Sequence, residues 1–128
     1  MVLYGYEKTN HELKDKFAKR ADALGMTIIS LPQQKRSTYT LLLDCGETRF
    51  LAAIRGIREQ NPHPRVFIEA AGIARAEACE YFAQPILVTD YEFPPQWPES
   101  MADLLKVRLV SFSEGNFTLA DIMGRQAA

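Results

Sequence analysis

Four polar residues in or at the ends of apolar runs are the first candidates for chemistry. Asp44 and Cys45 end the run TYTLLLDC, Asp90 ends the run PILVTD, and Glu69 lies inside RVFIEAA. If these three runs are parallel strands of one sheet, Asp44 and Asp90 meet at its carboxyl edge, where carboxylate oxygens can hold Mg²⁺. This arrangement would suit a small enzyme that acts on a phosphorylated or nucleic-acid substrate.

Cys45 is also a candidate nucleophile. The segment after it is expected to be helical, and backbone N–H groups at a helix start stabilise a thiolate. However, cysteine phosphatases place Cys and Arg six residues apart, whereas Arg49 follows Cys45 by four. A cysteine hydrolase needs a histidine base, and His63 precedes the second apolar run, at the opposite end of such a sheet. The alternative is a buried structural cysteine, and Cys79 is also expected to pack in a core.

Three families place a catalytic carboxylate at the end of an apolar strand. A response-regulator receiver needs an acidic pair and a later lysine, a toprim nuclease needs Asp-x-Asp at a longer spacing, and a restriction-type nuclease needs Glu-x-Lys. This chain has Glu-Ala-Ala at 69–71 and Asp-Tyr-Glu at 90–92, which complete none of these motifs. Strand-end carboxylates are more often helix caps or ion-pair partners.

Basic residues suggest a third possibility, an anion site. Arg49, Arg55 and Arg58 fall in a segment expected to be helical, where Arg55 and Arg58 are neighbours at i,i+3. Guanidinium groups match phosphate oxygens in geometry. With Lys35 and Arg36 of a nearby loop, they would allow weak nucleic-acid binding. The net charge of −1 and the lack of a glycine-rich phosphate loop argue against nucleic acid as the main partner.

A proline-rich loop after Asp90 carries three aromatic residues. Tyr91, Phe93 and Trp97 stand in YEFPPQWP, whose prolines exclude regular structure. Rigid aromatic side chains suit a pocket wall or an oligomer interface. The alternative is a loop that folds back over one end of the core. The first interpretation predicts a homo-oligomer.

The N-terminal elements that must position these residues follow from capping and periodicity. The capping box Thr9-x-x-Glu precedes an amphipathic helix over about 9–24, and a glycine ends it. The apolar segment 26–31 is expected to be a strand. Only six residues join it to the run 38–44, too few for a parallel crossover, so the two should form an antiparallel hairpin.

The centre of the chain alternates between apolar runs and helix-like segments. The runs 38–44, 65–71 and 85–90 are separated by the segments 47–60 and 73–83. This order predicts a βαβαβ unit, in which helices cover a sheet.

The remaining residues complete one domain. A loop over 91–98 is followed by a strand and a short helix within 107–124. We therefore expect a single α/β domain over 1–128: an antiparallel hairpin, then a βαβαβ core over about 38–90, in a mixed sheet of about five strands with helices packed on it.

Composition limits the class of protein. Hydrophobic residues make up 47% and charged residues 24%, which is typical of globular proteins. No apolar run approaches the roughly 18 residues that span a bilayer, no secretory signal is evident, and two cysteines build no disulfide framework. We therefore expect a cytoplasmic protein without membrane contact.

No catalytic constellation is complete, so the sequence favours a non-catalytic binding or interaction module. Its partner would be another protein or a small molecule, and no cofactor is expected. The alternative is the small enzyme that uses Asp44, Cys45 or Asp90, with Mg²⁺ as a possible cofactor.

Overall fold

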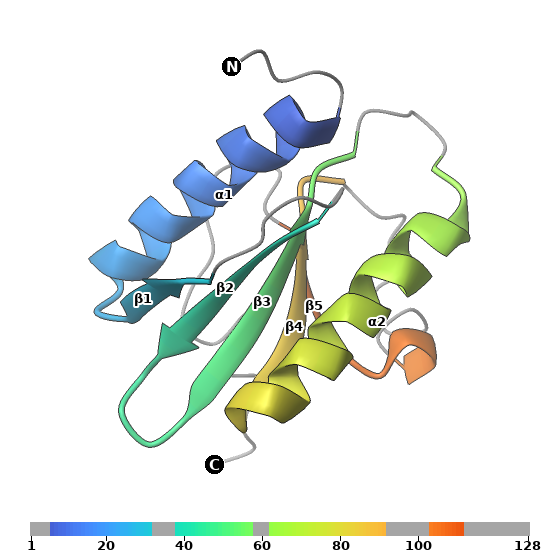
Figure 1. Ribbon diagram of the computed structural model, residues 1–128. Helices are drawn as coiled ribbons and strands as arrows, with labels where there is room; N and C mark the ends of the chain where they lie inside the picture. The colour runs from blue at the N-terminus through green and yellow to red at the C-terminus, as the bar shows by residue number, and fades with distance from the viewer. Residues whose placement is uncertain (1–5, 32–37, 58–61, 92–102, 112–128) are drawn as a thin grey trace.

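The computed structural model shows a five-stranded mixed sheet with one long helix on each face (Figure 1). It describes residues 6–31, 38–57, 62–91 and 103–111. The elements, in chain order, are α1 (Tyr6–Ala23), β1 (Thr27–Ser30), β2 (Tyr39–Asp44), β3 (Arg49–Arg55), α2 (Pro64–Tyr81), β4 (Gln84–Thr89) and β5 (Arg108–Ser111). No helix in these ranges combines the length and the apolar character that crossing a membrane requires.

The strands lie side by side in the order of the sequence. The pairs β1–β2 and β2–β3 are antiparallel, and the pairs β3–β4 and β4–β5 are parallel. The parallel strands therefore end together at one side of the sheet, the carboxyl edge. The opposite side, the amino edge, holds the β2–β3 hairpin and the starts of β4 and β5.

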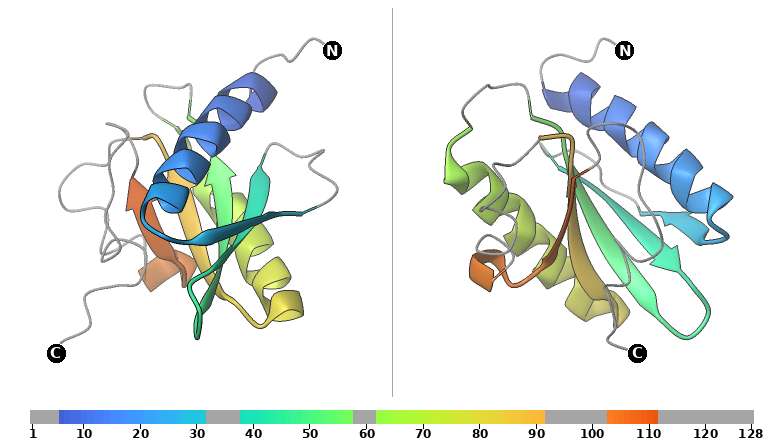
Figure 2. Two further views of the ribbon diagram at one scale, coloured as in Figure 1. Left: turned by 90° about the vertical axis from the view of Figure 1, so that its left-hand side faces the viewer. Right: turned by 180° about the vertical axis from the view of Figure 1, so that it is seen from behind.

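The two helices bury opposite faces of the sheet (Figure 2). Leu13 and Phe17 of α1 pack on one face, and Phe67 and Ala74 of α2 pack on the other. Side chains alternate between the faces along a strand. Because β3 is central and covered on both sides, its FLAAI stretch is apolar at every position.

Both long helices end at a residue in the left-handed conformation. Gly25 follows α1 with a φ of 90°, and Phe82 follows α2 with a φ of 53°. The N–H groups of Phe82 and Ala83 both donate to the Ala78 carbonyl, which satisfies an acceptor at the end of α2. Glycine adopts this conformation freely, whereas a residue with a Cβ atom is destabilised by roughly 1–2 kcal/mol.

The predicted fold class is confirmed: the chain forms a single α/β domain with a mixed five-stranded sheet. The predicted N-terminal helix is α1, but it begins at Tyr6, so Thr9 lies inside the helix and the predicted capping box is wrong. The predicted hairpin of 26–31 with 38–44 is β1–β2. The βαβαβ unit is present, but it begins one strand later than expected. It consists of β3, α2, β4, a helical turn at 103–105 and β5.

The assignment of the residues between 47 and 83 was wrong. The segment 47–60 contains β3 instead of a helix, and the segment 65–71 is helical and joins 73–83 in α2. A strand that is buried on both faces has no period of two, so its apolar run was indistinguishable from a helix. The start signal of α2 lies at 63–64: His63 accepts a hydrogen bond from the Arg65 N–H, and Pro64 occupies the first helical position.

The predicted loop beyond Tyr91 and the predicted short helix near the C-terminus lie outside the described residues.

Candidate functional site

Asp44 and Asp90 lie at opposite edges of the sheet, so their predicted convergence is wrong. Because β2 is antiparallel to β3, Asp44 pairs with Arg49 at the start of β3. Asp90 follows Thr89, which pairs with Arg55 at the end of β3. Six residue steps along β3 separate the two positions, about 20 Å at ~3.3 Å per residue. The two carboxylates therefore cannot hold the same ion.

Asp44 stabilises the β2–β3 turn. One carboxylate oxygen accepts a hydrogen bond of 2.9 Å from the Gly46 N–H, and the other lies 3.7 Å from Nε of Arg49. Gly46 has a φ of 91°, which glycine adopts without strain. The carboxylate thus acts as a turn residue and ion-pair partner.

Cys45 lies in this turn, where the surroundings disfavour a thiolate. The segment after it is β3, so the helix expected to stabilise the thiolate does not exist there. Burial raises the pKa of the Cys45 thiol, and the nearby Asp44 carboxylate raises it further. The helix on which the predicted activation of this cysteine depends is therefore absent from this position. Cys79, expected to be buried, is exposed on α2.

The predicted cationic helix face is also wrong. Arg49 and Arg55 are the two ends of β3, and they lie at opposite edges of the sheet. Arg49 is exposed beside Asp44, and Arg55 is buried. The other basic candidates, Arg58 and the Lys35–Arg36 pair, lie outside the described residues.

At the carboxyl edge, three side chains hold the backbone that leaves β3. The Oδ1 atom of the fully buried Asn10, on α1, accepts a hydrogen bond from the Gly56 N–H. Asp90 Oδ1 accepts one of 2.8 Å from the Ile57 N–H, and Arg55 Nη1 donates one of 2.7 Å to the Gly56 carbonyl. We call this set of contacts the Asn10 network.

Arg55 is the charged centre of the Asn10 network. Burial lowers the pKa of its guanidinium group, because a desolvated cation is less stable than a hydrated one. The carboxylates of Glu69 and Asp90 act in the opposite direction and favour the charged form. The two carboxylates therefore offset part of the cost of burying the Arg55 charge.

Tyr91 is the one described member of the aromatic loop. Its N–H donates to Thr89 Oγ1, and its carbonyl accepts a hydrogen bond of 2.8 Å from Ser111 Oγ. Its ring lies 5.8 Å from that of Phe67, between centroids. Tyr91 thus covers the core at the carboxyl edge. Phe93 and Trp97 lie outside the described residues.

A different surface, which the sequence did not indicate, lies at the amino edge beside the end of α2. It is a groove of about 540 Å³, and we call it the α2 groove. One wall is the end of α2, the floor is the start of β4, and the other wall is the segment before β5. Its lining residues are Arg75, Ala78, Cys79, Phe82, Ala83, Pro85 and Lys106.

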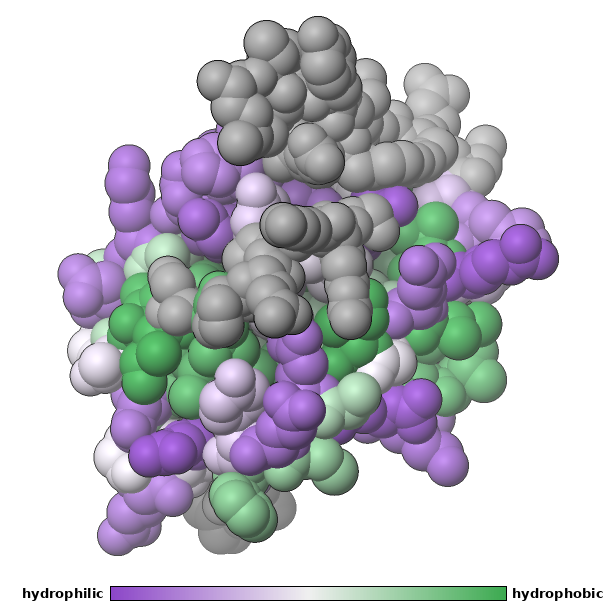
Figure 3. Space-filling view, in the orientation of Figure 1, coloured by the Kyte–Doolittle hydropathy of each residue, from purple (hydrophilic) through white to green (hydrophobic). Residues whose placement is uncertain are grey.

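Phe82 makes the α2 groove unusual, because this large aromatic side chain is 94% exposed. The face seen in Figure 3 shows apolar areas with hydrophilic side chains around them. Phe82 and Lys106 are, moreover, the two non-glycine residues with a positive φ in the described part of the chain. Strained backbone of this kind is typical of functional sites.

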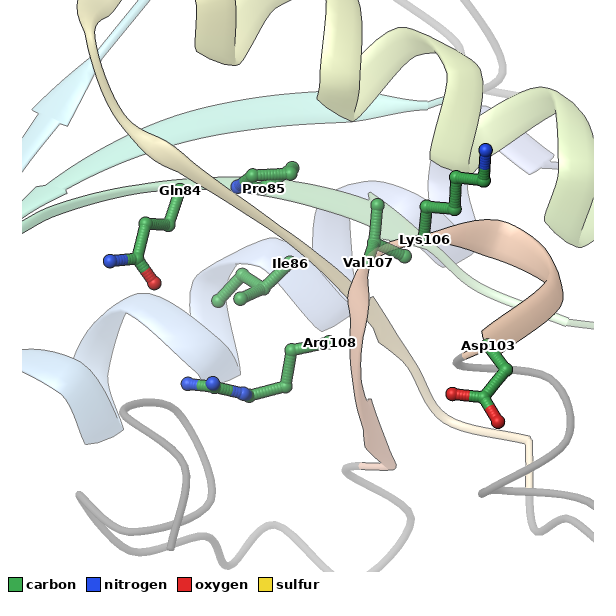
Figure 4. Close-up of a pocket in the computed structure, with 7 residues that line it drawn as sticks. All are labelled: Gln84, Pro85, Ile86, Asp103, Lys106, Val107 and Arg108. Carbon is green, nitrogen blue, oxygen red and sulfur yellow. The ribbon is translucent and has the colours of Figure 1, made fainter. Parts of the chain in front are cut away.

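A second hollow, of about 310 Å³, adjoins the α2 groove and shares Pro85 and Lys106 with it. Figure 4 shows that Lys106 extends toward α2, whereas Gln84 and Arg108 point toward the α1 side of the sheet. The cations Lys106 and Arg108 therefore face opposite sides. Only Lys106 belongs to the α2 groove.

The structure thus presents a polar network at the carboxyl edge of the sheet and an apolar groove at the amino edge. The Asn10 network directs its hydrogen bonds to backbone groups, and the α2 groove exposes apolar surface flanked by cations. Within the described ranges, no three His, Cys, Asp or Glu side chains gather as a metal site would require. No family model, no curated protein and no solved structure matches this chain.

Proposed function

We propose that the protein is a non-catalytic binding module that holds an apolar side chain of a partner protein in the α2 groove. Phe82 carries this proposal. Leaving a Phe side chain in water forgoes roughly 1.5–3 kcal/mol of burial energy, and the left-handed backbone costs roughly 1–2 kcal/mol more. A partner that covers Phe82 would recover the burial energy, as aromatic residues at interfaces do.

The openness of the α2 groove favours a protein partner over a small molecule. Its volume of about 540 Å³ falls in the range of ligand sites. Small-molecule sites, however, enclose most of their ligand, and the groove cannot do so while a lining residue is 94% exposed. A segment of another chain can lie along such a surface.

The separation of the polar candidates supports a binding role. About 20 Å of β3 separates Asp44 and Cys45 from Asp90, so the three cannot act on one substrate atom. Asp90 and Arg55 are engaged by the backbone next to β3. This is the arrangement of a fixed scaffold.

We also propose a cytoplasmic location, which the two free thiols support because disulfides form in oxidising compartments. The homo-oligomer stays a prediction from the aromatic loop. Light scattering at micromolar concentrations should give a mass above that of one chain. The mass of a single chain at every concentration would remove this part of the proposal.

Chemical-shift mapping with indole, a neutral aromatic probe, tests the groove. In the ¹⁵N-labelled full chain, we expect shifts at amides 78–86, and we expect Phe82→Ser to lose them. Ile29→Ser removes another exposed apolar residue, on β1, the outer strand on the side of the sheet opposite β5. This variant should keep the shifts. Absence of these shifts, or identical shifts in Phe82→Ser, would contradict the proposal.

A further inference from the structure

We infer that the partner segment is acidic, with an apolar side chain flanked on both sides by carboxylates. This inference rests on the proposed function, since it concerns the same groove. The lining of the α2 groove contains two cations and no anion. One cation stands on each wall: Arg75 on α2, and Lys106 on the segment before β5.

Neither cation forms an ion pair with another described residue. Arg75 and Lys106 are exposed. The ion pairs between described residues join Asp15 to His11 and Lys14, and Asp44 to Arg49, and so leave these two cations out.

The nearest acidic residue on the second wall does not neutralise Lys106. Figure 4 shows Asp103 pointing away from Lys106, whose side chain extends toward α2. The remaining lining includes the apolar Ala78 on the α2 wall and Ala83 and Pro85 on the floor. A bound segment would therefore meet an apolar surface at its centre and a positive charge on either side.

The two kinds of contact have different effects. Burial of Phe82 would supply most of the affinity, because exposed ion pairs each contribute little. The cations would set the preference for acidic sequences and speed association, and salt would weaken both effects. Reversal of both charges is expected to lower the affinity for an acidic segment about tenfold.

A random-peptide display library, selected in parallel on the full chain and on the Arg75→Glu/Lys106→Glu double variant, tests this inference. On the natural chain, we expect enriched peptides that carry Asp or Glu around an aromatic or Leu residue. On the double variant, we expect Lys or Arg around the same kind of residue. The milder Arg75→Gln/Lys106→Gln variant, checked for folding by circular dichroism, should select apolar peptides without a charge preference.

Phe82→Ser separates the failure of this inference from the failure of the proposed function. One outcome would overturn the acidic partner but keep the proposed groove. In that outcome, the peptides selected on all charge variants carry the same flanking charge around an apolar residue, and they lose binding to Phe82→Ser. Both the inference and the proposed function would be overturned if Phe82→Ser did not change peptide binding. The same holds if no peptide were enriched relative to selection on the unfolded chain. Acidic peptides that bind about tenfold more weakly to Phe82→Ser would support both.

Discussion

The two edges of the parallel strands use their side chains in opposite ways. At the carboxyl edge, Asn10, Arg55 and Asp90 form hydrogen bonds with the backbone at 56–57. At the amino edge, Phe82 exposes an aromatic ring on a left-handed backbone. The first arrangement stabilises the fold and the second destabilises it. Under the proposed function, the amino edge serves binding at the expense of stability.

The ends of the two helices show the same contrast. After each helix the chain turns through a left-handed residue, which is Gly25 after α1 and Phe82 after α2. Glycine is the usual residue at this position because it lacks a Cβ atom. The phenylalanine therefore has no local conformational explanation.

The largest effect on stability is expected from Asn10→Ala, at the carboxyl edge. The buried Gly56 N–H would lose its acceptor, which costs about 2 kcal/mol. Urea unfolding measures this loss, and Lys19→Ala on the exposed side of α1 should change stability by less than about 0.5 kcal/mol. Indole binding should be the same in both variants. A loss of binding in Asn10→Ala while it remains folded would show that the two edges are coupled.

Two glycines provide a smaller, paired test of the helix ends. Gly25→Ala forces a Cβ atom onto a φ of 90° and should cost about 1 kcal/mol. Gly72→Ala, within α2, should instead stabilise the protein by about 1 kcal/mol through helix propensity. Nothing lies within 4 Å of the added Cβ atom at either site, so the opposite signs report backbone conformation alone. If both substitutions changed the melting temperature in the same direction, the conformational explanation would be wrong.

The two cysteines should differ in reactivity without a large effect on stability. Cys79 is exposed in the α2 groove, while Cys45 is partly buried and its pKa is raised. Burial and a raised pKa both lower the reactivity of Cys45 at neutral pH, so iodoacetamide should modify the exposed Cys79 about tenfold faster. Mass spectrometry of the alkylated peptides gives both rates. Faster modification of Cys45 would place an activated thiolate in the β2–β3 turn after all.

The general architecture could be predicted from the sequence, because periodicity and loop length are local signals. They identified α1, the β1–β2 hairpin and the α/β class. They failed at β3 and α2, since burial on both faces removes the alternation that marks a strand. If β3 were a helix, 38–44 and 85–90 could be parallel strands, and Asp44 and Asp90 would lie at the same edge. Because β3 is a strand antiparallel to β2, they lie at opposite edges.

The α2 groove could not be predicted, because it combines residues from three elements that only the fold brings together. The expectation of a site at the carboxyl edge follows a general rule for parallel sheets, and here the groove lies at the opposite edge. One signal was present in the sequence: the stretch EYFAQ ends a helix with no glycine. An aromatic residue at that position marks the groove.

Phe82→Gly tests the central claim most directly, because stability and binding should change in opposite directions in one protein. Urea unfolding should show a gain of about 1 kcal/mol, since glycine suits the left-handed conformation. Indole mapping on the same sample should show no shifts at amides 78–86. A loss of stability, or indole shifts like those of the natural chain, would contradict the claim that Phe82 is retained for binding.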